Sequence, residues 1–256
     1  MKFDFIMCVN KDNPFFSRAI SSIVEQEYDD DYGIIVVANN CTDEFYLKLQ
    51  LIAKNTPKII LERTAIGQVA FNLNYAANLS QADYLVRMDA DDFSLPNRLK
   101  ITAEKIKQLN YPDVLSGGVN YIDEQDTIIK KMSFDMDRKK LTRELAYRNI
   151  VSHPASALKR TSLISVRGYA GGVNSEDYDL WLRMLRSGLN IVLFPEVILF
   201  YRISPYQVKG SSIAYADGIG IKIREFFLTG NTRFLFGFFY EIAKYFYLKV
   251  TKKISD

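Results

Sequence analysis

Short apolar runs alternate with longer segments of helical spacing through the first half of the chain. Four runs have the length and composition of buried strands, at residues 3–9, 33–38, 58–61 and 84–88. Four segments repeat apolar positions every three or four residues, at residues 14–27, 43–55, 67–79 and 96–109. Apolar strands separated by helices favour a parallel sheet that is covered on both faces. We therefore predict an α/β fold with a Rossmann-like, mostly parallel sheet flanked by helices.

The second half of the chain is less regular. Its pattern predicts strands at residues 113–123, 126–134 and 190–203, and a helix at residues 138–149. We expect one domain over residues 1–205, followed by a C-terminal helical appendage over residues 206–256.

Polar residues stand where three of the predicted strands end, at residues 8–10, 39–43 and 89–91. Right-handed crossovers place the carboxyl ends of parallel strands along one edge, where open α/β sheets bind their ligands. The sequence therefore predicts a ligand site at this edge.

Three carboxylates follow the strand at residues 84–88, namely Asp89, Asp91 and Asp92. Two carboxylates one residue apart can offer oxygens to a hard divalent cation such as Mg²⁺ or Mn²⁺, which also accepts phosphate oxygens of a substrate. The alternative is a solvated turn whose acidic residues cap the helix that begins near Pro96.

Composition excludes several other classes. The chain has 256 residues, 48% of them hydrophobic, with a formal net charge of +3, which is too small to indicate nucleic-acid binding. Its two cysteines match no metal-binding or disulfide spacing. The N-terminus does not resemble a signal peptide, since Asp4 interrupts a short apolar segment, and no apolar run is long enough to span a bilayer. We therefore expect a cytoplasmic protein.

Several motifs together resemble the family 2 glycosyltransferases of GT-A fold. They are FIMCVNKDNPFFSRAISSIVEQ, IIVVANNCTD, LNYAANLSQADYLVRMDADDFSLPNRL and SEDYDLWLRMLRSG, which cover roughly residues 3–212 in the order of that family. The resemblance implies a nucleotide-binding half at about residues 1–110 and an acceptor half at about residues 111–205. It also implies an inverting, metal-dependent enzyme of bacterial polysaccharide or O-antigen biosynthesis.

By this resemblance, Asp89 and Ala90 would contact the nucleotide, and Asp91 would bind the Mn²⁺ or Mg²⁺ that bridges the donor diphosphate. Asp92 would support the site or act as a cap. Cys8, Val9 and Asn10 would line the base pocket.

The rest of the nucleotide site departs from the family pattern. Asn39 stands where the family carries an aspartate that accepts a hydrogen bond from uracil, which supports a UDP-sugar less firmly and leaves dTDP- and GDP-sugars open. Arg63 and Asp12 could reach the nucleotide, or could be ordinary solvated charges. Arg202 would pair with the diphosphate, assisted by Lys209.

Asp177 matches the general base of the family, and Glu176 would orient the acceptor. The alternative is that both residues only favour the positive end of a helix. His153 and Trp181 are predicted on the acceptor side, with a structural histidine and a core tryptophan as the alternatives. Asp179 is expected to pair with Arg183 one helical turn later.

The C-terminal segment from Arg233 has helical spacing. Its pattern predicts an apolar face with Leu235, Phe238 and Phe246, and an opposite face with Gly237 and Glu241. Such a helix suits a membrane interface, and the alternative is docking on the protein or in a dimer. The enzyme would then lie peripherally on the cytosolic face of the inner membrane.

The expected function is transfer of a sugar from a nucleotide-diphosphate donor, most simply a UDP-sugar, to a hydroxyl of a glycan or lipid-linked glycan. Two alternatives are open at this point: a sugar nucleotidyltransferase, and a non-catalytic protein that binds nucleotide-sugars or glycans. The first would normally carry a Gly-rich basic loop after the first strand, where this chain has residues 10–14, NKDNP.

Overall fold

The computed structural model describes residues 1–172, 174–203 and 212–251. The expected Lys209 therefore lies outside the described residues. The strands are β1 (Phe3–Val9), β2 (Tyr32–Asn39), β3 (Ile59–Thr64), β4 (Tyr84–Met88), β5 (Phe93–Ser94), β6 (Val114–Ile122), β7 (Ile128–Met132), β8 (Ser156–Lys159) and β9 (Ile191–Arg202). The helices are α1 (Phe16–Val24), α2 (Asp43–Asn55), α3 (Val69–Leu79), α4 (Arg98–Gln108), α5 (Arg138–Leu145), the short 3₁₀ turn η1 (His153–Ala155), α6 (Arg160–Ser165), α7 (Glu176–Arg186), α8 (Ser212–Thr229) and α9 (Thr232–Val250).

The strands form one mixed sheet of order β3-β2-β1-β4-β8-β6-β9-β5, with β7 paired to β6. Strands β1 to β4 are parallel to one another, and β6 and β9 are parallel to each other. Strand β8 runs antiparallel between β4 and β6. The strand order reverses at β1, because β2 lies on one side of it and β4 on the other, and such a switch point opens a crevice at the carboxyl ends.

Two apolar clusters cover the two faces of the sheet. Along β1, Phe3, Phe5 and Met7 belong to one cluster and Ile6 to the other, as the two-residue period of a strand requires. Helices α1, α2 and α4 complete the first cluster, and α3 and α5 to α7 complete the second. The predicted α/β fold with a mostly parallel, helix-flanked sheet is confirmed.

The sequence pattern missed the shortest elements. Strands β5 and β8 and helix α6 have two to six residues. At this length no hydrophobic period is visible in the sequence. The two strands are defined by their pairing with strands distant in sequence.

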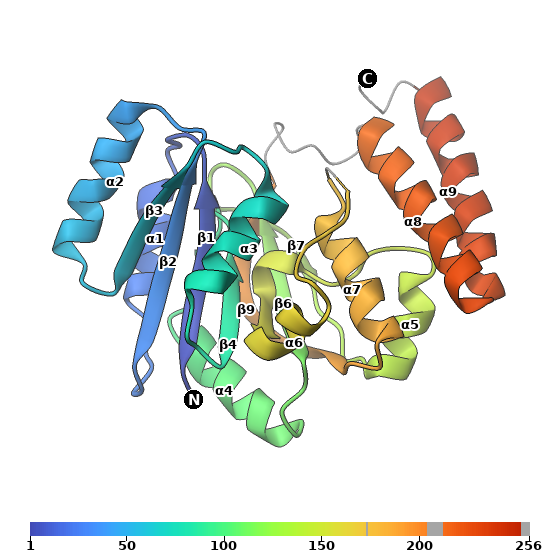
Figure 1. Ribbon diagram of the computed structural model, residues 1–256, viewed down its shortest axis with the longest axis horizontal. Helices are drawn as coiled ribbons and strands as arrows, with labels where there is room; N and C mark the ends of the chain where they lie inside the picture. Colours follow the sequence, from blue (N-terminus) through green and yellow to red (C-terminus); the bar gives the residue numbers. More distant parts are fainter. Residues whose placement is uncertain (173, 204–211, 252–256) are drawn as a thin grey trace.

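The two C-terminal helices, α8 and α9, form a hairpin that packs against α7, and Figure 1 shows it at the opposite end of the molecule from α2. Ile221 of α8 and Phe234 of α9 are buried in the same cluster as Tyr178 and Trp181 of α7. The hairpin therefore shares a core with the domain that precedes it. Among the described helices, none is both long and apolar enough to cross a bilayer.

Candidate functional site

A cavity of about 790 Å³ opens at the carboxyl edge of the sheet. Residues from β1, β4 and α7 meet there, including Asn10, Asp89, Asp91, Glu176 and Asp177. The segments at residues 8–10 and 89–91 follow neighbouring parallel strands, which is why residues far apart in sequence converge. The site thus lies at the edge where the sequence predicted it.

Arg87 is the cation beneath this cavity. Its side chain is almost fully buried in β4, and its Nη2 lies 2.5 Å from Oδ1 of Asp89. The same positive charge lowers the pKa values of Asp91, Glu176 and Asp177 against the larger, opposing effect of burial. Arg87 therefore offsets part of the repulsion among the carboxylates of the site.

Asp91 and Asp92 differ in their surroundings. Burial, followed by repulsion from Asp89, raises the pKa of Asp91. Asp92 is buried, accepts a hydrogen bond from the backbone N–H of Arg202 at 2.8 Å, and keeps Oδ2 without a hydrogen-bond partner among the described residues. Neither carboxylate caps α4, since no side chain caps that helix, so the capping alternative does not describe these residues.

The chemistry of the donors fits a hard divalent cation. Asp89 and Asp91 line one cavity, and the pKa of Asp91 is raised first by burial and then by repulsion from Asp89. In the described part of the chain, however, no three His, Cys, Asp or Glu side chains are grouped as a complete metal site. Phosphate oxygens and water would have to supply the remaining ligands.

The residues predicted for the nucleotide base lie at the ends of β1 and β2. Asn10 lines the cavity, and Asn39 donates from Nδ2 to the carbonyl of Val9 at 3.0 Å. Burial raises the pKa of the Cys8 thiol to about 12, so it stays protonated. The Ala90 carbonyl faces the Nδ2 of Asn13 at 3.4 Å.

Two predicted charges are held by surface partners. Arg63 donates to the Asp43 carboxylate at 2.7 Å and to the Cys41 carbonyl at 3.0 Å. Asp12 pairs with Lys48 at 2.7 Å. Neither Arg63 nor Asp12 is among the residues that line the cavity, so the solvated alternative fits them better.

Arg202 is tied into the protein by every nitrogen of its guanidinium. Nε donates to the Asp91 carbonyl at 2.9 Å, Nη1 to the Asp123 carbonyl at 2.6 Å, and Nη2 lies 2.5 Å from Asp126. Its side chain is buried and stacks over Phe15 at 3.7 Å. This arrangement favours a structural role, in which Arg202 holds the end of β9 against the Asp91 loop, and the phosphate contact stays a prediction.

The acidic pair opens α7 at the far side of the cavity. Asp177 accepts hydrogen bonds from Asn149 Nδ2 at 2.9 Å and from the N–H of Tyr178 at 2.7 Å, while burial raises its pKa. Burial and repulsion from Asp177 raise the pKa of Glu176 to about 7. The expected pair of Asp179 with Arg183 is confirmed at 2.6 Å.

His153 and Trp181, which the sequence placed on the acceptor side, pack against each other below the cavity. The Nε2 of His153 lies 2.9 Å from the hydroxyl of Tyr169, and burial holds its pKa well below the usual range, so the ring is neutral. His153 lines the cavity, but Trp181 is fully buried and packs edge-on against the His153 ring. Trp181 is therefore a core residue, which agrees with the alternative of a core tryptophan. It contacts the cavity-lining His153 and does not itself line the cavity.

A second cavity of about 620 Å³ adjoins the first and shares Asn149, Asn174 and Asp177 with it. Ala214 and Glu241 of the hairpin also line both cavities. The other walls of the second cavity come from α8 and α9, with Lys222, Tyr240 and Lys244, and from the segments around Arg148 and Tyr178. The acidic pair thus lies between the nucleotide edge and the C-terminal hairpin.

Sequence reasoning missed Arg87 and Asn149. A charged residue inside the apolar run YLVRM was a usable signal for Arg87, because a buried arginine needs a carboxylate partner. No sequence signal links Asn149 with Asp177, since a loop carries it to that carboxylate across 28 positions.

Comparisons with known proteins agree with this geometry. Residues 5–167 match the family model described as glycosyl transferase family 2. The chain is 34% identical over 225 residues to the O-antigen biosynthesis glycosyltransferase WbnJ of Escherichia coli, covering 86% of this chain and 87% of that protein. It is 28% identical over 216 residues to an E. coli UDP-Gal:alpha-D-GlcNAc-diphosphoundecaprenol beta-1,3-galactosyltransferase, covering 81% and 76%.

Solved structures share the fold. A fragment of S. aureus TarS in complex with UDP-GlcNAc superposes with a TM-score of 0.69 at 13% identity, over 88% of this chain. The same fragment in complex with UDP gives a TM-score of 0.66 at 15% identity, over 87% of this chain. In both comparisons the match covers 65% of the TarS fragment, which is just under two thirds of its length.

The expected fold and the expected family are thus both confirmed. The expectation of a glycosyltransferase enzyme is confirmed as well, in preference to a sugar nucleotidyltransferase or a non-catalytic binding protein. The chain belongs to glycosyltransferase family 2 and is a glycosyltransferase of GT-A fold.

Proposed function

We propose that this enzyme moves a sugar from a UDP-sugar to a hydroxyl of a lipid-linked glycan, with inversion at the anomeric carbon. One observation carries the proposal. The carboxylates that end β4 and the acidic pair that opens α7 line the same cavity, so a donor and an acceptor can meet in it.

The donor base would lie against the ends of β1 and β2. Because Nδ2 of Asn39 already donates to Val9, the group that Asn39 offers a ligand is its Oδ1, an acceptor that suits the ring N–H of uracil. Two TarS structures hold UDP and UDP-GlcNAc, and one E. coli relative is named for UDP-Gal, which supports the choice of uracil.

Asp91, with Asp89 beside it, would hold Mn²⁺ or Mg²⁺ together with the donor diphosphate. The ion supplies positive charge that stabilises the departing nucleoside diphosphate. Arg87 orients Asp89 from below and reduces the mutual repulsion of the carboxylates while the donor enters.

Asp177 would take the proton of the acceptor hydroxyl. That oxygen forms the new bond to the anomeric carbon while the bond from this carbon to the phosphate oxygen breaks, and the electron pair leaves with the nucleoside diphosphate. The hydrogen bonds from Asn149 and Tyr178 fix the carboxylate in place, and its raised pKa strengthens it as a base. Glu176 and the neutral His153 would position the acceptor sugar.

The acceptor would enter through the second cavity. Lys244 of α9 would provide exposed positive charge on the hairpin side of this cavity, whereas Lys222 is paired with Glu241. The E. coli relative named for a diphosphoundecaprenol-linked sugar supports a lipid-linked acceptor, and such an acceptor would place the enzyme peripherally at the cytosolic face of a membrane.

Substitution of the base tests this mechanism. We expect Asp177→Asn to lower the rate of transfer by about 10²- to 10⁴-fold, because the hydroxyl loses its proton acceptor. Donor binding should survive, since Asp177 lies apart from the nucleotide edge. Transfer is measured with radiolabelled UDP-sugars, and binding as the rise in melting temperature with UDP and Mn²⁺.

Asp135→Asn, which removes an exposed carboxylate, is the matched control. If Asp177→Asn transferred sugar at the rate of the unaltered enzyme, Asp177 would not be the general base. A melting temperature of the unaltered enzyme that responds to GDP- or dTDP-sugars and not to UDP-sugars would overturn the choice of donor.

A further inference from the structure

The C-terminal hairpin buries some of its charged side chains and exposes several large apolar ones. Lys222 and Glu225 of α8 are each only 1% exposed. In contrast, Phe227 of α8 is 78% exposed and Val250 of α9 is 82% exposed. A helix normally turns its apolar stripe to the core and its charges to water.

Ion pairs account for the polar interior. Lys222 pairs with Glu241, and Glu225 lies 2.5 Å from Arg186 of α7 and 2.9 Å from Arg224. Gly237 lets α9 approach α5 closely, since a Cβ at this position would overlap the carbonyl oxygen of Ala146. The small and acidic stripe of α9, with Gly237 and Glu241, therefore faces the protein.

The outward face of α9 is aromatic. Its exposed large side chains are Phe236, Phe239, Tyr240, Phe246, Tyr247 and Val250. Residues three and four apart lie side by side on a helix, so these side chains form two aromatic groups along α9, Phe236 to Tyr240 and Phe246 to Val250, with the exposed Ala243 and Lys244 between them. We call the two groups together the aromatic strip. Tyrosines and phenylalanines in this arrangement are typical of the interface between a bilayer and water.

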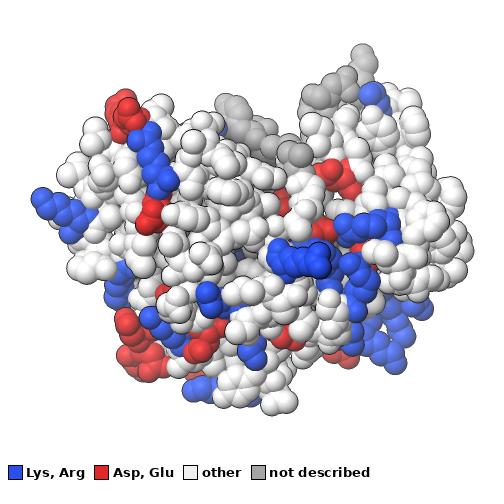
Figure 2. Space-filling view, in the orientation of Figure 1, with Lys and Arg blue, Asp and Glu red and all other residues white. Residues whose placement is uncertain are grey.

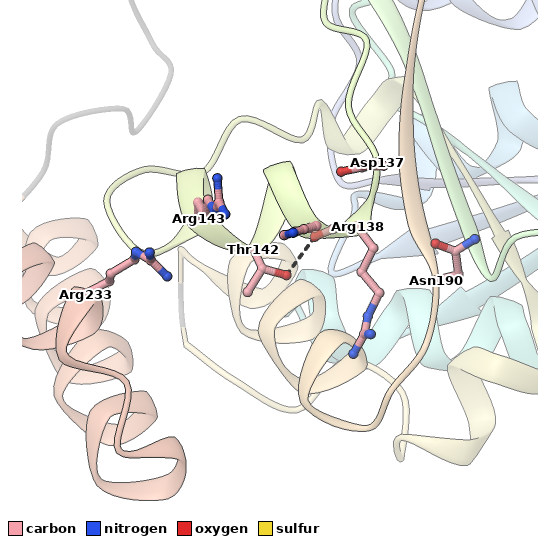
Figure 3. A pocket seen from close by; sticks show the side chains of 7 residues that line it. Asp137, Arg138, Thr142, Arg143, Asn190 and Arg233 are labelled. Atoms are coloured by element: carbon pink, nitrogen blue, oxygen red, sulfur yellow. Dashed lines mark hydrogen bonds between the residues drawn. The ribbon is translucent and has the colours of Figure 1, made fainter.

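Uncompensated positive charge adjoins this strip. A cavity of about 700 Å³ beside the first turn of α9 is lined by Arg138, Lys139, Arg143 and Arg233, with Asp137 as its one acidic residue. Figure 3 shows Arg143 of α5 and Arg233 of α9 on the two sides of this cavity. Within the described residues, no carboxylate lies within ion-pair distance of these four cations, and Asp137 is engaged as the cap of α5. We call Arg138, Lys139, Arg143 and Arg233 the basic cluster.

Figure 2 shows Lys and Arg side chains gathered at the lower right of the molecule, below a surface over α8 and α9 that is nearly free of charge. All three carboxylates of the described hairpin are turned to protein partners: Glu225 and Glu241 form ion pairs, and Asp217 accepts from the N–H of Asn174. Arg233, Lys244 and Lys249 are exposed. A second copy of this face would therefore offer no carboxylates to the basic cluster, whereas the headgroups of anionic lipids would offer it negatively charged phosphates.

We propose that the outer face of α8–α9 and the basic cluster together form a docking surface for an anionic phospholipid bilayer. The aromatic strip enters the interface, and the basic cluster lies against the headgroups. The proposal rests on the contacts of the hairpin and of α5, and its test requires no sugar transfer.

Cosedimentation of the full chain with vesicles tests the surface. We expect the protein to pellet with vesicles of phosphatidylcholine and phosphatidylglycerol, to pellet much less with phosphatidylcholine alone, and to be released by salt. The double variant Lys139→Glu, Arg143→Glu should lower partitioning by at least about tenfold, since each cation near an anionic surface contributes about fivefold. The double variant Phe236→Ser, Phe239→Ser should lower it on both kinds of vesicle.

Matched controls lie on the opposite side of the molecule. Lys11→Glu with Lys54→Glu changes the net charge equally, and Leu47→Ser with Leu51→Ser removes comparable exposed apolar surface from α2. Both controls should bind vesicles like the unaltered chain. Circular dichroism and melting temperature verify that all variants are folded.

Equal binding by variants and controls would overturn the proposal, as would equal binding to neutral and anionic vesicles. A third result would also overturn it: light scattering that shows a dimer, lost in Phe236→Ser, Phe239→Ser, together with no vesicle binding. That outcome would assign the aromatic strip to a second copy of the chain.

Discussion

At the scale of single residues, the site is a group of carboxylates gathered around one buried arginine. Arg87 contacts Asp89 and acts through its charge on Asp91, Glu176 and Asp177. Burial outweighs this charge, so the pKa values of the last three carboxyls remain raised. A raised pKa means that the folded protein holds protons which the unfolded chain has already released.

Glu176 makes this testable. Its pKa rises from 4.5 to about 7, so stability falls as the pH rises between these values and the full cost is present above pH 7. Full conversion of this rise corresponds to roughly 3 kcal/mol, and we expect about 1 to 2 kcal/mol because the side chain is partly exposed. Glu176→Gln should therefore be more stable than the unaltered chain at pH 8 and equally stable near pH 4.

Urea denaturation at the two pH values measures the difference. Glu44→Gln, on the exposed face of α2, controls for the change of side chain. The same difference in free energy of unfolding at both pH values would show that Glu176 titrates normally.

At the scale of elements, the hairpin depends on the close approach of α9 to α5. Gly237→Ala places a methyl group where the Ala146 carbonyl oxygen lies, and both partners belong to helical or adjoining backbone that cannot turn aside. We expect a loss of about 1 to 3 kcal/mol in the free energy of unfolding. Gly220 of α8 has nothing within 4 Å of the corresponding position, so Gly220→Ala should instead add about 0.5 to 1 kcal/mol.

The two glycines thus form an internal pair with opposite expected signs. Thermal and urea unfolding measure both, and limited proteolysis reports whether α9 has detached. Stabilisation by both substitutions would mean that α9 does not rest on Ala146.

At the scale of the whole molecule, the hairpin shares the hydrophobic core that α7 helps to form. Ile221 and Phe234 complete a cluster with Tyr178, and Arg224 lies 2.6 Å from the buried Asp179. The sequence suggested an appendage that begins near residue 206. The shared core indicates instead that these helices support the domain on which they pack.

Truncation tests whether the hairpin is an independent appendage or supports the rest of the domain. A chain that ends at residue 203 should unfold at a lower urea concentration, with a loss of several kcal/mol, because it exposes the apolar surface of α7 and leaves Asp179 without one of its two arginines. An unchanged midpoint would support an independent appendage. Melting temperature with UDP then shows whether the nucleotide half survives.

Local pattern was sufficient for much of this protein. The boundaries of β1 and β4 match the apolar runs at residues 3–9 and 84–88, and those of α2 match the segment of helical spacing at residues 43–55. The reason is that strand and helix periods are set by residues close together in the sequence. The aspartates after β4 and the acidic pair at α7 were recognisable for the same reason, since each motif lies within a few positions of its element.

Residues whose role depends on distant partners were not predictable in this way. The family resemblance implied a phosphate contact for Arg202, which stays a prediction, but gave no sign of its contacts with Asp91, Asp123 and Asp126. These residues meet Arg202 only after β9 pairs with β6 and β5. The sequence showed that α9 is amphipathic, but not whether its apolar face lies against the protein or is exposed. The ion pairs of Lys222 and Glu225 turn the charged stripe inward, and they require helices from three parts of the chain.

The sequence by itself therefore determined the alternation of strands and helices, the family and the acidic residues at the sheet edge. The tertiary structure alone decided which charges are neutralised, which aromatic residues are exposed and which side chains share a cavity. The physical reason is that periodicity is set by neighbouring residues, whereas burial and charge compensation are set by packing between segments that the chain brings together only when it folds.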